Sequence, residues 1–261
     1  LRFLRHDWEG GCADLLELTR ARPRFARAHY HLGVARFAAG LDVERSGRDG
    51  RQQLDEAIAD LVRTSALEPD AGTSLTRTSR GVALVGRAEA ETRHGGDPVP
   101  WYEQAIAEHD EALRRLPEFV GALMNRAMAL RGLAVALARQ GKVGRPALAR
   151  ARDDCDEALR LSPNEVIAWL NRGLVRLSAG DAAGAIADFD EAIARRPACR
   201  KAWLNRSAAH LQAHAFEQAE ADAGRAIELA PDDALGYANR GIARRGRAER
   251  DAAGGKDPQA A

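Results

Sequence analysis

The sequence predicts an all-helical protein, an α-solenoid built from antiparallel helix pairs. The dipeptide Asn-Arg occurs four times, at successive gaps of 46, 34 and 34 residues, and a proline recurs at gaps of 46, 48, 46, 34 and 34 residues. The 261 residues are 45% hydrophobic and 30% charged, and the helix formers Ala, Leu, Arg and Glu dominate. A fixed period in such a chain is typical of stacked helical repeats.

The clearest units lie at 166–199 and 200–233, and each is 34 residues long. Apolar and small residues recur in each at steps of three and four along two stretches, which predicts two amphipathic helices. A short turn such as Ala179–Asp181 separates the two stretches. Proline closes the unit, as at Pro197, because it cannot continue a helix.

The order of residue types in these units resembles the tetratricopeptide repeat, whose helix pairs carry an aromatic residue, a small residue, alanines and a closing proline. The matching residues are Trp169, Gly173, Ala185, Phe189, Ala192 and Pro197 in the first unit, and Trp203, Ser207, Ala219, Ala226 and Pro231 in the second. The large side chains fill the space between helices, and the small ones let the backbones approach. The resemblance implies a superhelix whose first helices line a concave, partner-binding groove.

The same frame extends toward the N-terminus over three longer units, at 26–71, 74–119 and 120–165. Each has 46 residues, twelve more than the 34-residue units. The extra residues look like helix up to a turn at Gly141–Pro146 in the third unit, and the second has a turn at Gly95–Pro98. In the first unit they look like a loop, LDVERSGRDGRQ. We therefore expect taller helix hairpins before Val166 than after it.

Incomplete units are predicted at both ends of the array. Residues 1–25 contain a second helix at Gly11–Arg22, and residues 234–250 contain a first helix. Beyond it the pattern dissolves into a tail, 251–261. We count residues 1–250 as a single solenoid domain.

The ends of the chain bear on self-association. The sequence starts at Leu1 and not at methionine, which we interpret as a processed product or a segment of a larger protein. Apolar residues near the ends, Leu4, Leu15, Leu235 and Ile242, lack an evident capping repeat. Because solenoids need polar caps, we expect self-association through these ends or cover by another segment.

Charge and cysteine content narrow the partners and the compartment. The formal net charge of +1 gives no general attraction to nucleic acid or anionic membranes. No apolar run approaches the ~20 residues that span a bilayer, so no membrane contact is expected. Three widely separated cysteines predict no disulfide framework and favour a cytoplasmic location. Cys155 takes the slot of Phe189 in the next unit and is expected to be buried.

The C-terminal helix is a local exception, because it carries the arginines Arg240, Arg244, Arg245, Arg247 and Arg250. These could contact a polyanion. The interspersed Glu249 and Asp251 favour the alternative of a solvated helix end, so we expect no nucleic-acid partner.

No catalytic constellation or cofactor motif is present in the sequence. It contains no phosphate-binding glycine loop, no serine elbow and no HExxH. His210 and His214 are four residues apart but lack a third ligand, so no metal site is predicted. We therefore expect a non-enzymatic protein without a cofactor.

An arginine and an acid recur together, one of each per unit. The arginines are Arg80, Arg126, Arg172, Arg206 and Arg240, and the acids of the second helices are Asp60, Glu108, Asp154, Asp188 and Asp222. Their co-occurrence favours an ion pair between packed helices over a ligand-binding stripe of arginines. Leu32 replaces the arginine in the first full unit and leaves Asp60 without that partner.

The residue before each arginine is the candidate for partner binding. It is asparagine at Asn125, Asn171, Asn205 and Asn239, with Ser79 and His31 in the upstream slots. Such an asparagine ladder in tetratricopeptide arrays holds an extended peptide, and an amide suits this task because it both donates and accepts hydrogen bonds. The alternative is that Asn-Arg-Gly is only a packing signature of one repeat subfamily.

The residues expected beside the ladder in the groove are Ile167, Leu170, Leu174, Lys201 and Leu204. Leucines at 170 and 204 stand where co-chaperone repeats carry the lysine that grips a terminal carboxylate, which argues against that binding mode. We predict a protein-interaction module that binds an extended peptide segment or a helix of a partner. The alternative is a regulatory or self-assembly arm of a larger bacterial signalling protein, such as a serine/threonine kinase.

Overall fold

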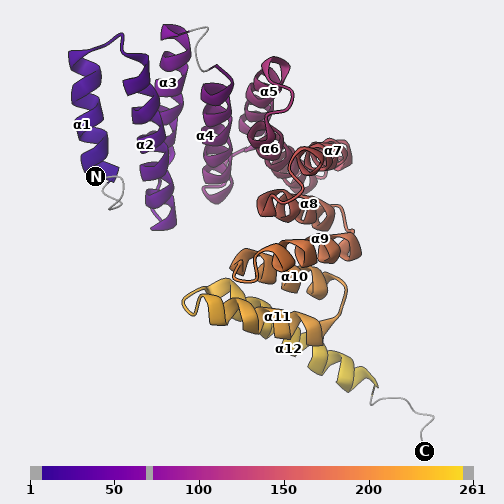
Figure 1. Cartoon of the computed structure of the whole chain (residues 1–261). Coiled ribbons are helices and arrows are strands. Elements are labelled where there is room, and N and C mark those ends of the chain that lie inside the picture. The colour runs from indigo at the N-terminus through magenta and orange to yellow at the C-terminus, as the bar shows by residue number, and fades with distance from the viewer. Residues whose placement is uncertain (1–7, 69–72, 255–261) are drawn as a thin grey trace, which may run out of the picture. The chain divides into compact units, whose positions relative to one another are not determined.

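The computed structural model describes residues 8–68 and 73–254, and every regular element in these ranges is an α-helix (Figure 1). The predicted all-helical solenoid of packed helix pairs is confirmed. The chain divides into two compact units, residues 1–154 and 155–261, with the boundary inside α7 (Arg145–Leu161). The single domain over 1–250 stays a prediction.

The N-terminal unit contains α1 (Trp8–Ala21), α2 (Ala26–Arg45), α3 (Arg51–Leu67), α4 (Thr73–Arg93), α5 (Val99–Arg115), α6 (Val120–Arg139) and the first part of α7. Helices α2 and α3 form one hairpin and α4 and α5 the next, while α1 packs on α2 as the second helix expected at the N-terminal end (Figure 1). The first helices α2, α4 and α6 contact one another in order and therefore share one face.

The C-terminal unit contains the rest of α7, then α8 (Val166–Ser178), α9 (Ala182–Arg195), α10 (Arg200–Gln212), α11 (Phe216–Leu229) and α12 (Ala234–Gly254). Helix α8 pairs with α9 and α10 with α11, while α12 packs on both α11 and α10. Helix α12 continues to Gly254, so the expectation that the tail begins at residue 251 is wrong for residues 251–254. The remainder of the expected tail lies outside the described residues, as does Leu4.

The hairpins before Val166 are taller than those after it, as the spacing predicts. The first helices α2, α4 and α6 have 20, 21 and 20 residues, whereas α8 and α10 have 13 each. The second helices α3, α5 and α7 have 17 residues, whereas α9 and α11 have 14. At ~1.5 Å per residue, the first helices gain roughly 10 Å.

The loop expected in the first long unit is mostly helix. Helix α2 continues to Arg45 and α3 begins at Arg51, so only residues 46–50 of LDVERSGRDGRQ lie outside helices. The buried Glu44 carboxylate accepts a hydrogen bond from the Gly50 N–H at 2.8 Å and so ties the two helix ends together. Charged residues on the exposed side of a helix end look like a loop in a sequence, which is why this expectation is wrong.

All five hairpin turns of the full units use a left-handed residue two positions after the first helix. The φ angles are +78° at Gly47, +76° at Gly95, +70° at Gly141, +88° at Gly180 and +57° at His214. Glycine adopts this conformation without steric cost. In each of the five turns, the N–H of the following residue donates to a carbonyl of the first helix, as from Asp181 N to Arg176 O at 2.9 Å. His214 is the one residue other than glycine that occupies this left-handed position in the five turns.

A size match between paired helices fills the core of several units. Three first helices carry Gly33, Gly81 and Gly173, and their second helices carry Leu61, His109 and Phe189 in the facing slot. A Cβ on any of these glycines would lie within 3.0 Å of the facing side chain. Cys155 occupies the same second-helix slot and is fully buried, as expected.

Candidate functional site

The recurrent arginines form ion pairs, and each of three holds two acids. Arg172 donates to Asp188 of its own unit and to Asp156 of the preceding second helix, both at 2.7 Å. The same double contact is made by Arg126 with Asp154 and Asp110, and by Arg206 with Asp222 and Asp190. We call each such set an arginine clamp. The predicted pairing between helices is therefore confirmed.

The clamps leave little positive charge for a ligand. Hydrogen bonds to Asp222 raise the pKa of Arg206, and hydrogen bonds to Asp154 raise the pKa of Arg126. The side chain of Asp188 is only 1% exposed and also accepts Arg176 at 3.0 Å. These arginines neutralise buried carboxylates, so we interpret them as structural and not as a binding stripe.

The two ends of the arginine series depart from the pattern. Asp60 lacks its arginine because Leu32 stands in that slot, and Arg36 pairs with it instead at 2.5 Å, one helical turn further on. Arg240 lies over the Tyr237 ring, 5.2 Å from its centroid, and no carboxylate pairs with it in the part of the chain that the structure describes. Within the described residues, Arg240 has neither a second helix of its own unit nor an acid in the preceding slot, which is Gly224, so no clamp forms there.

The asparagine slots differ in their surroundings. Asn125 on α6 is partly exposed, as is Asn205 on α10, whereas Asn171 is only 9% exposed. Asn239 on α12 donates its amide N–H to the Leu204 carbonyl at 3.2 Å. Burial of Asn171 and the intrachain bond of Asn239 favour the packing role for these two. A peptide-binding role of the ladder stays a prediction.

The apolar residues predicted beside the ladder also divide. Ile167 is 49% exposed, and Lys201 is exposed as well. Leu170 belongs to a buried core cluster with Phe189, and Leu174 packs against that cluster. Leu204 is partly exposed. The structure thus leaves Ile167 and Lys201 available to a partner and places Leu170 in the core.

A groove that the sequence did not reveal lies on the first helices of the N-terminal unit. Its volume is about 390 Å³, and its lining includes Tyr30, Val34, Phe37, Val82, Phe119 and Asn125. We call it the apolar groove. Val34 is 40% exposed and Leu75, at its edge, is 53% exposed. Of the predicted peptide-binding residues, only Asn125 lines it.

Polar groups are few in the apolar groove and sit where they could meet a peptide backbone. Ser79, in the ladder slot of α4, lies 3.1 Å from the Tyr30 hydroxyl. A second hollow of about 450 Å³ shares Tyr30 and Leu75 with the groove and is lined by Arg27, His31 and Glu68. The groove therefore continues from an apolar slot to a charged rim.

The sequence holds a signal for the apolar groove that the asparagine repeat obscured. Tyr30, Val34 and Phe37 are spaced by four and three residues, so they share one side of a helix next to His31, which occupies the ladder slot. Their side chains are larger and more apolar than a solvent-exposed helix face requires. The unit at 26–71 has histidine in the slot where the other units have asparagine, so the asparagine pattern does not point to it.

One trio of potential metal ligands occurs among the described residues, and its chemistry is that of an ion-pair cluster. Glu44, Asp49 and His94 lie together at the far end of the first long hairpin. Glu44 accepts hydrogen bonds from Arg93 and lies 3.2 Å from His94, while Asp49 pairs with Arg51 at 2.7 Å. The arginines occupy the carboxylates that a cation would need.

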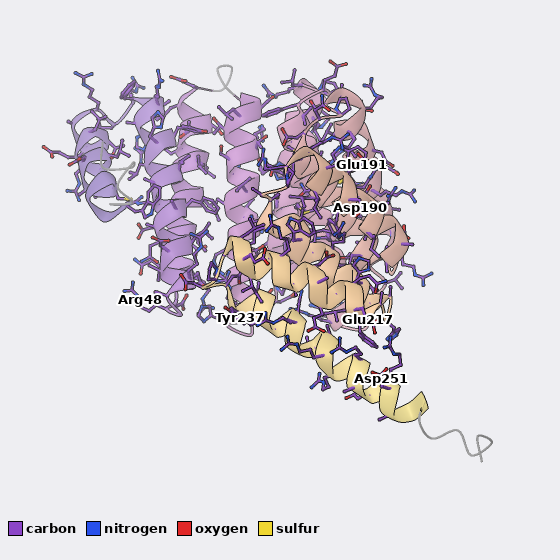
Figure 2. All side chains as sticks on the ribbon, turned by 60° about the horizontal axis from the view of Figure 1, so that its bottom comes forward. Arg48, Asp190, Glu191, Glu217, Tyr237 and Asp251 are labelled. Atoms are coloured by element: carbon purple, nitrogen blue, oxygen red, sulfur yellow. The ribbon has the colours of Figure 1, made fainter. Side chains whose placement is uncertain are left out.

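The C-terminal arginines are mostly paired. Arg244 and Arg247 contact Glu220 of α11 at 2.6 and 2.9 Å, and Arg250 contacts Glu217 at 2.5 Å. Figure 2 shows this stretch of α12 between Tyr237 and Asp251. These pairs favour the solvated helix end over a polyanion contact.

Helix α6 is long and apolar enough to cross a bilayer, with a mean hydropathy of 1.3, contrary to the expectation that no run approaches this length. Its residues Leu123, Ala127 and Leu130 are buried, and it packs on α4 and α5. Arg126 within it is held by two aspartates. A core helix passes the same test of length and composition, so we interpret α6 as the first helix of its repeat.

The helix pairs, the small-to-large contacts between them and the closing prolines agree with a match to the tetratricopeptide repeat family. The family model matches residues 133–197 and 170–234. Over these residues the chain contains tetratricopeptide repeats. Its matched repeats run from the end of α6 to the end of α11.

Two solved structures of tetratricopeptide repeat proteins share this fold. One, from Parabacteroides merdae, has a TM-score of 0.64 and 18% identity and covers 96% of this chain and 84% of its own. The other, a thermophilic protein of Thermus thermophilus, has a TM-score of 0.59 and 20% identity and covers 82% of this chain and 99% of its own. No curated protein matches the sequence.

Proposed function

We propose that this protein is a protein-interaction module that holds an extended peptide in the apolar groove of its N-terminal unit. The observation that carries the proposal is the groove itself, an open apolar slot across three consecutive first helices. Pockets of this size and character that offer a few polar groups are typical of ligand sites. Ion pairs join each groove helix to the second helix of its unit, Arg36 with Asp60, Arg80 with Glu108 and Arg126 with Asp154, so the site is held in shape before binding.

The lining defines the partner. Aromatic and aliphatic side chains on α2, α4 and α6 suit one large apolar side chain of the peptide. The Asn125 amide and the Ser79 hydroxyl lie on consecutive first helices of the same lining and can meet backbone N–H and C=O groups of any sequence. The proposed ligand is thus an extended segment with an apolar anchor residue and modest demands on its other positions.

A peptide library displayed against the full chain tests the proposal, followed by calorimetric titration of a selected peptide. Val34→Glu places a charge in the groove and should weaken binding at least tenfold, since burying an unpaired charge costs more than ~1.4 kcal/mol. Ile167→Glu is the matched control, because Ile167 is similarly exposed on a first helix of the C-terminal unit. Loss of binding in the control with none in Val34→Glu would move the site to the asparagine ladder of α8 and α10.

A second candidate function, self-assembly or docking to another segment, is favoured by exposed apolar side chains on α12. Leu235, Tyr237 and Ile242 are 59%, 47% and 45% exposed. Leu235 and Ile242 are two helical turns apart and so share one side of the helix. Light scattering over a concentration series tests it: a dimer that Leu235→Glu with Ile242→Glu dissolves supports self-assembly, and a monomer at all concentrations removes it.

A further inference from the structure

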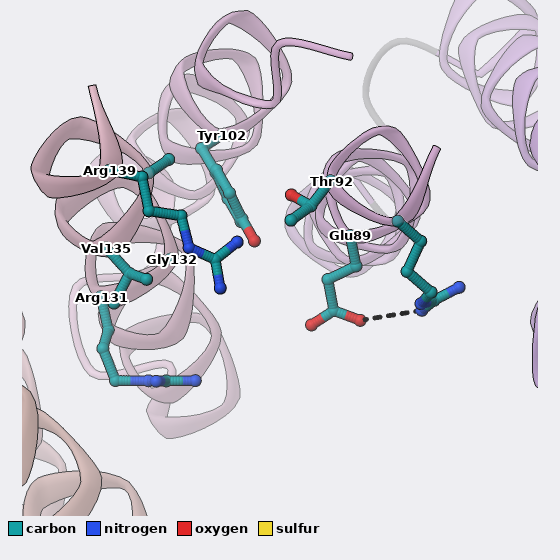
Figure 3. Close-up of a pocket in the computed structure, with 9 residues that line it drawn as sticks. Glu89, Thr92, Tyr102, Arg131, Gly132, Val135 and Arg139 are labelled. Atoms are coloured by element: carbon teal, nitrogen blue, oxygen red, sulfur yellow. Dashed lines mark ion pairs between the residues drawn. The ribbon is translucent and has the colours of Figure 1, made fainter. Parts of the chain in front are cut away.

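A second pocket, distinct from the apolar groove, lies on the part of the first helices that only the long repeats possess. It has a volume of about 310 Å³ between α4, α5 and α6 (Figure 3). Helix α8 ends at Ser178, whose equivalent in α6 is Gly132, but α6 continues to Arg139. Val135, Ala136 and Arg139 in the lining therefore have no counterpart in a 34-residue unit. We call it the arginine pocket.

The arginine pocket contains a cation that the protein does not neutralise. Arg131 is partly buried, its buried Nε atom has no hydrogen-bond partner, and no carboxylate forms an ion pair with it within the described chain. Burial lowers the pKa of Arg131, whereas the carboxylate-paired Arg126 on the same helix has its pKa raised. An unpaired guanidinium in such a position is costly, and an anion would relieve the cost.

Two further donors face the same space. Figure 3 shows Tyr102, Arg131 and Arg139 on one side of the pocket and Thr92 and Glu89 on the other. Arg139 at the rim has no ion-pair partner in the ranges that the structure describes. The Tyr102 hydroxyl is unbonded there too, and burial raises the pKa of Tyr102, which keeps its proton available for donation. Thr92 contributes no donor, because its hydroxyl already binds the Ala88 carbonyl at 3.0 Å.

The remaining charged residues near the pocket are Arg93, Glu44 and Glu89. Arg93 is held by the buried Glu44 and lies 3.9 Å from Glu89, so its charge is already used. Glu89 is 53% exposed at its side chain and opposes any anion that enters. The charges of Arg131 and Arg139 together exceed that of Glu89, so the pocket keeps a net positive charge that favours an anion.

Gly132 leaves the space on α6 that the Tyr102 ring occupies. A Cβ on Gly132 would lie 2.4 Å from the Tyr102 ring and 2.9 Å from its hydroxyl oxygen. The ring can lie flat on α6 and present its hydroxyl to the pocket only because no side chain is there. The donors are therefore set by the packing of α5 on α6 and not by a mobile loop.

We propose that the arginine pocket binds a phosphate monoester, held by the guanidinium groups of Arg131 and Arg139 and by the Tyr102 hydroxyl. Guanidinium groups present forked donors that match phosphate oxygens, and a phosphate monoester carries close to two negative charges at neutral pH. The ester could belong to a small molecule or to a phosphorylated side chain of a bound segment. The pocket shares no lining residue with the apolar groove, so the two proposals stand or fall separately.

Calorimetric titration of the full chain tests this, with inorganic phosphate, glucose 6-phosphate and an alanine-flanked phosphoserine peptide as probes. We expect saturable binding at one site and no heat from chloride at the same ionic strength. Arg131→Gln, Arg139→Gln and Tyr102→Phe should each weaken binding, the arginine variants by at least about tenfold, because each removes a charged hydrogen bond. Glu89→Gln should tighten it by removing the like charge.

Arg145→Gln is the matched control, since it removes one exposed arginine elsewhere in the same unit and should leave affinity unchanged. Arg139 is exposed, so its variant keeps the test valid even if Arg131→Gln unfolds the protein. Tighter binding of the sugar phosphate than of the peptide assigns the site to a small molecule, and the reverse order assigns it to a phosphorylated segment. Equal affinity for wild type, Arg139→Gln and Arg145→Gln, or no binding of any probe, overturns the proposal.

Discussion

The long repeats of the N-terminal unit and the short repeats of the C-terminal unit use the same clamp but finish their first helices differently. Arg126 in one and Arg172 in the other each hold a buried acid of their own unit and a more exposed acid of the preceding second helix. Yet the equivalent slots of the first helices have different surroundings in α2 and α8. Leu170, Leu174 and Leu177 of α8 pack with a buried core cluster, whereas Tyr30, Val34 and Phe37 in the equivalent slots of α2 line the apolar groove.

The comparison separates what specifies the fold from what specifies the surface. The clamp and the glycine-to-large contact recur in both kinds of repeat and set how the two helices of a pair meet. Groove-slot identity and first-helix length vary between them, and both proposed sites depend on these two properties. The twelve additional residues supply both a taller face and a second pocket.

Breaking a clamp should give the largest effect. Asp188→Ala leaves Arg172 and Arg176 without their buried carboxylate, and we expect a loss of about 3–5 kcal/mol in the free energy of unfolding. Asp190→Ala, which removes an exposed acid, should cost no more than ~1 kcal/mol. Urea denaturation followed by circular dichroism measures both, and equal losses would show that burial does not govern the clamp.

The buried imidazole of His109 makes the N-terminal unit sensitive to acid. Burial, with the nearby Arg126, lowers the pKa of His109 from 6.5 to about 4. Because the unfolded chain binds the proton first, stability should be complete above pH ~6.5, fall by up to about 3 kcal/mol between pH ~6.5 and ~4, and level off below that. His109→Phe, which copies the Phe189–Gly173 pair, should remove this dependence. Thermal melts from pH 4 to 7 that coincide in slope for both proteins would refute the assignment.

Glycines of the two units should respond oppositely to alanine. Gly132→Ala pushes the Tyr102 ring away and should cost about 1–3 kcal/mol. Gly224→Ala in α11 meets nothing within 4 Å and should stabilise by up to ~1 kcal/mol, since alanine favours the helix. Melting temperatures measure both changes, and a stabilising Gly132→Ala would mean that Tyr102 is not fixed by α6.

Substitutions in the asparagine ladder should give the smallest changes in affinity and stability. We expect Asn125 to act in peptide binding and Asn171 in packing. Asn125→Ala should weaken a groove-selected peptide by about 1 kcal/mol without moving the melting temperature. Asn171, which is 9% exposed, should do the reverse, with alanine costing about 1 kcal/mol of stability and no affinity. Calorimetry and melting curves on both variants distinguish them, and a purely peptide-binding Asn171 would restore the full ladder.

The sequence predicted the fold almost completely because period, proline spacing and small-to-large alternation are local properties. It also predicted the arginine–acid pairs from co-occurrence alone. The sequence did not predict the burial of residues that occupy equivalent slots in two units but have different neighbours. Leu170 and Tyr30 occupy equivalent positions, and only the packing of neighbouring helices shows that one is in the core and the other in a groove.

The arginine pocket was beyond the reach of the sequence for a related reason. Arg131 lies among apolar residues in a helix that looks uniform, and the equivalent slots in α4 and α8 carry Val85 and Leu177. Arg139 does recur, as Arg45 and Arg93 at the ends of the other two long first helices, but there it looks like an ordinary charged helix end. Tyr102 meets Arg131 and Arg139 only because Gly132 leaves room across a helix pair. A site that depends on residues without counterparts in the other repeats, such as Arg131 and Tyr102, gives no periodic signal.

Hydrogen–deuterium exchange on the full chain, with and without a groove-selected peptide, tests most directly whether the long repeats bind the partner. We expect the peptide to slow exchange in α2, α4 and α6 around Val34, Val82 and Asn125, and to leave α8 and α10 unchanged. Protection confined to residues 166–212, with none in the three long first helices, would contradict this account.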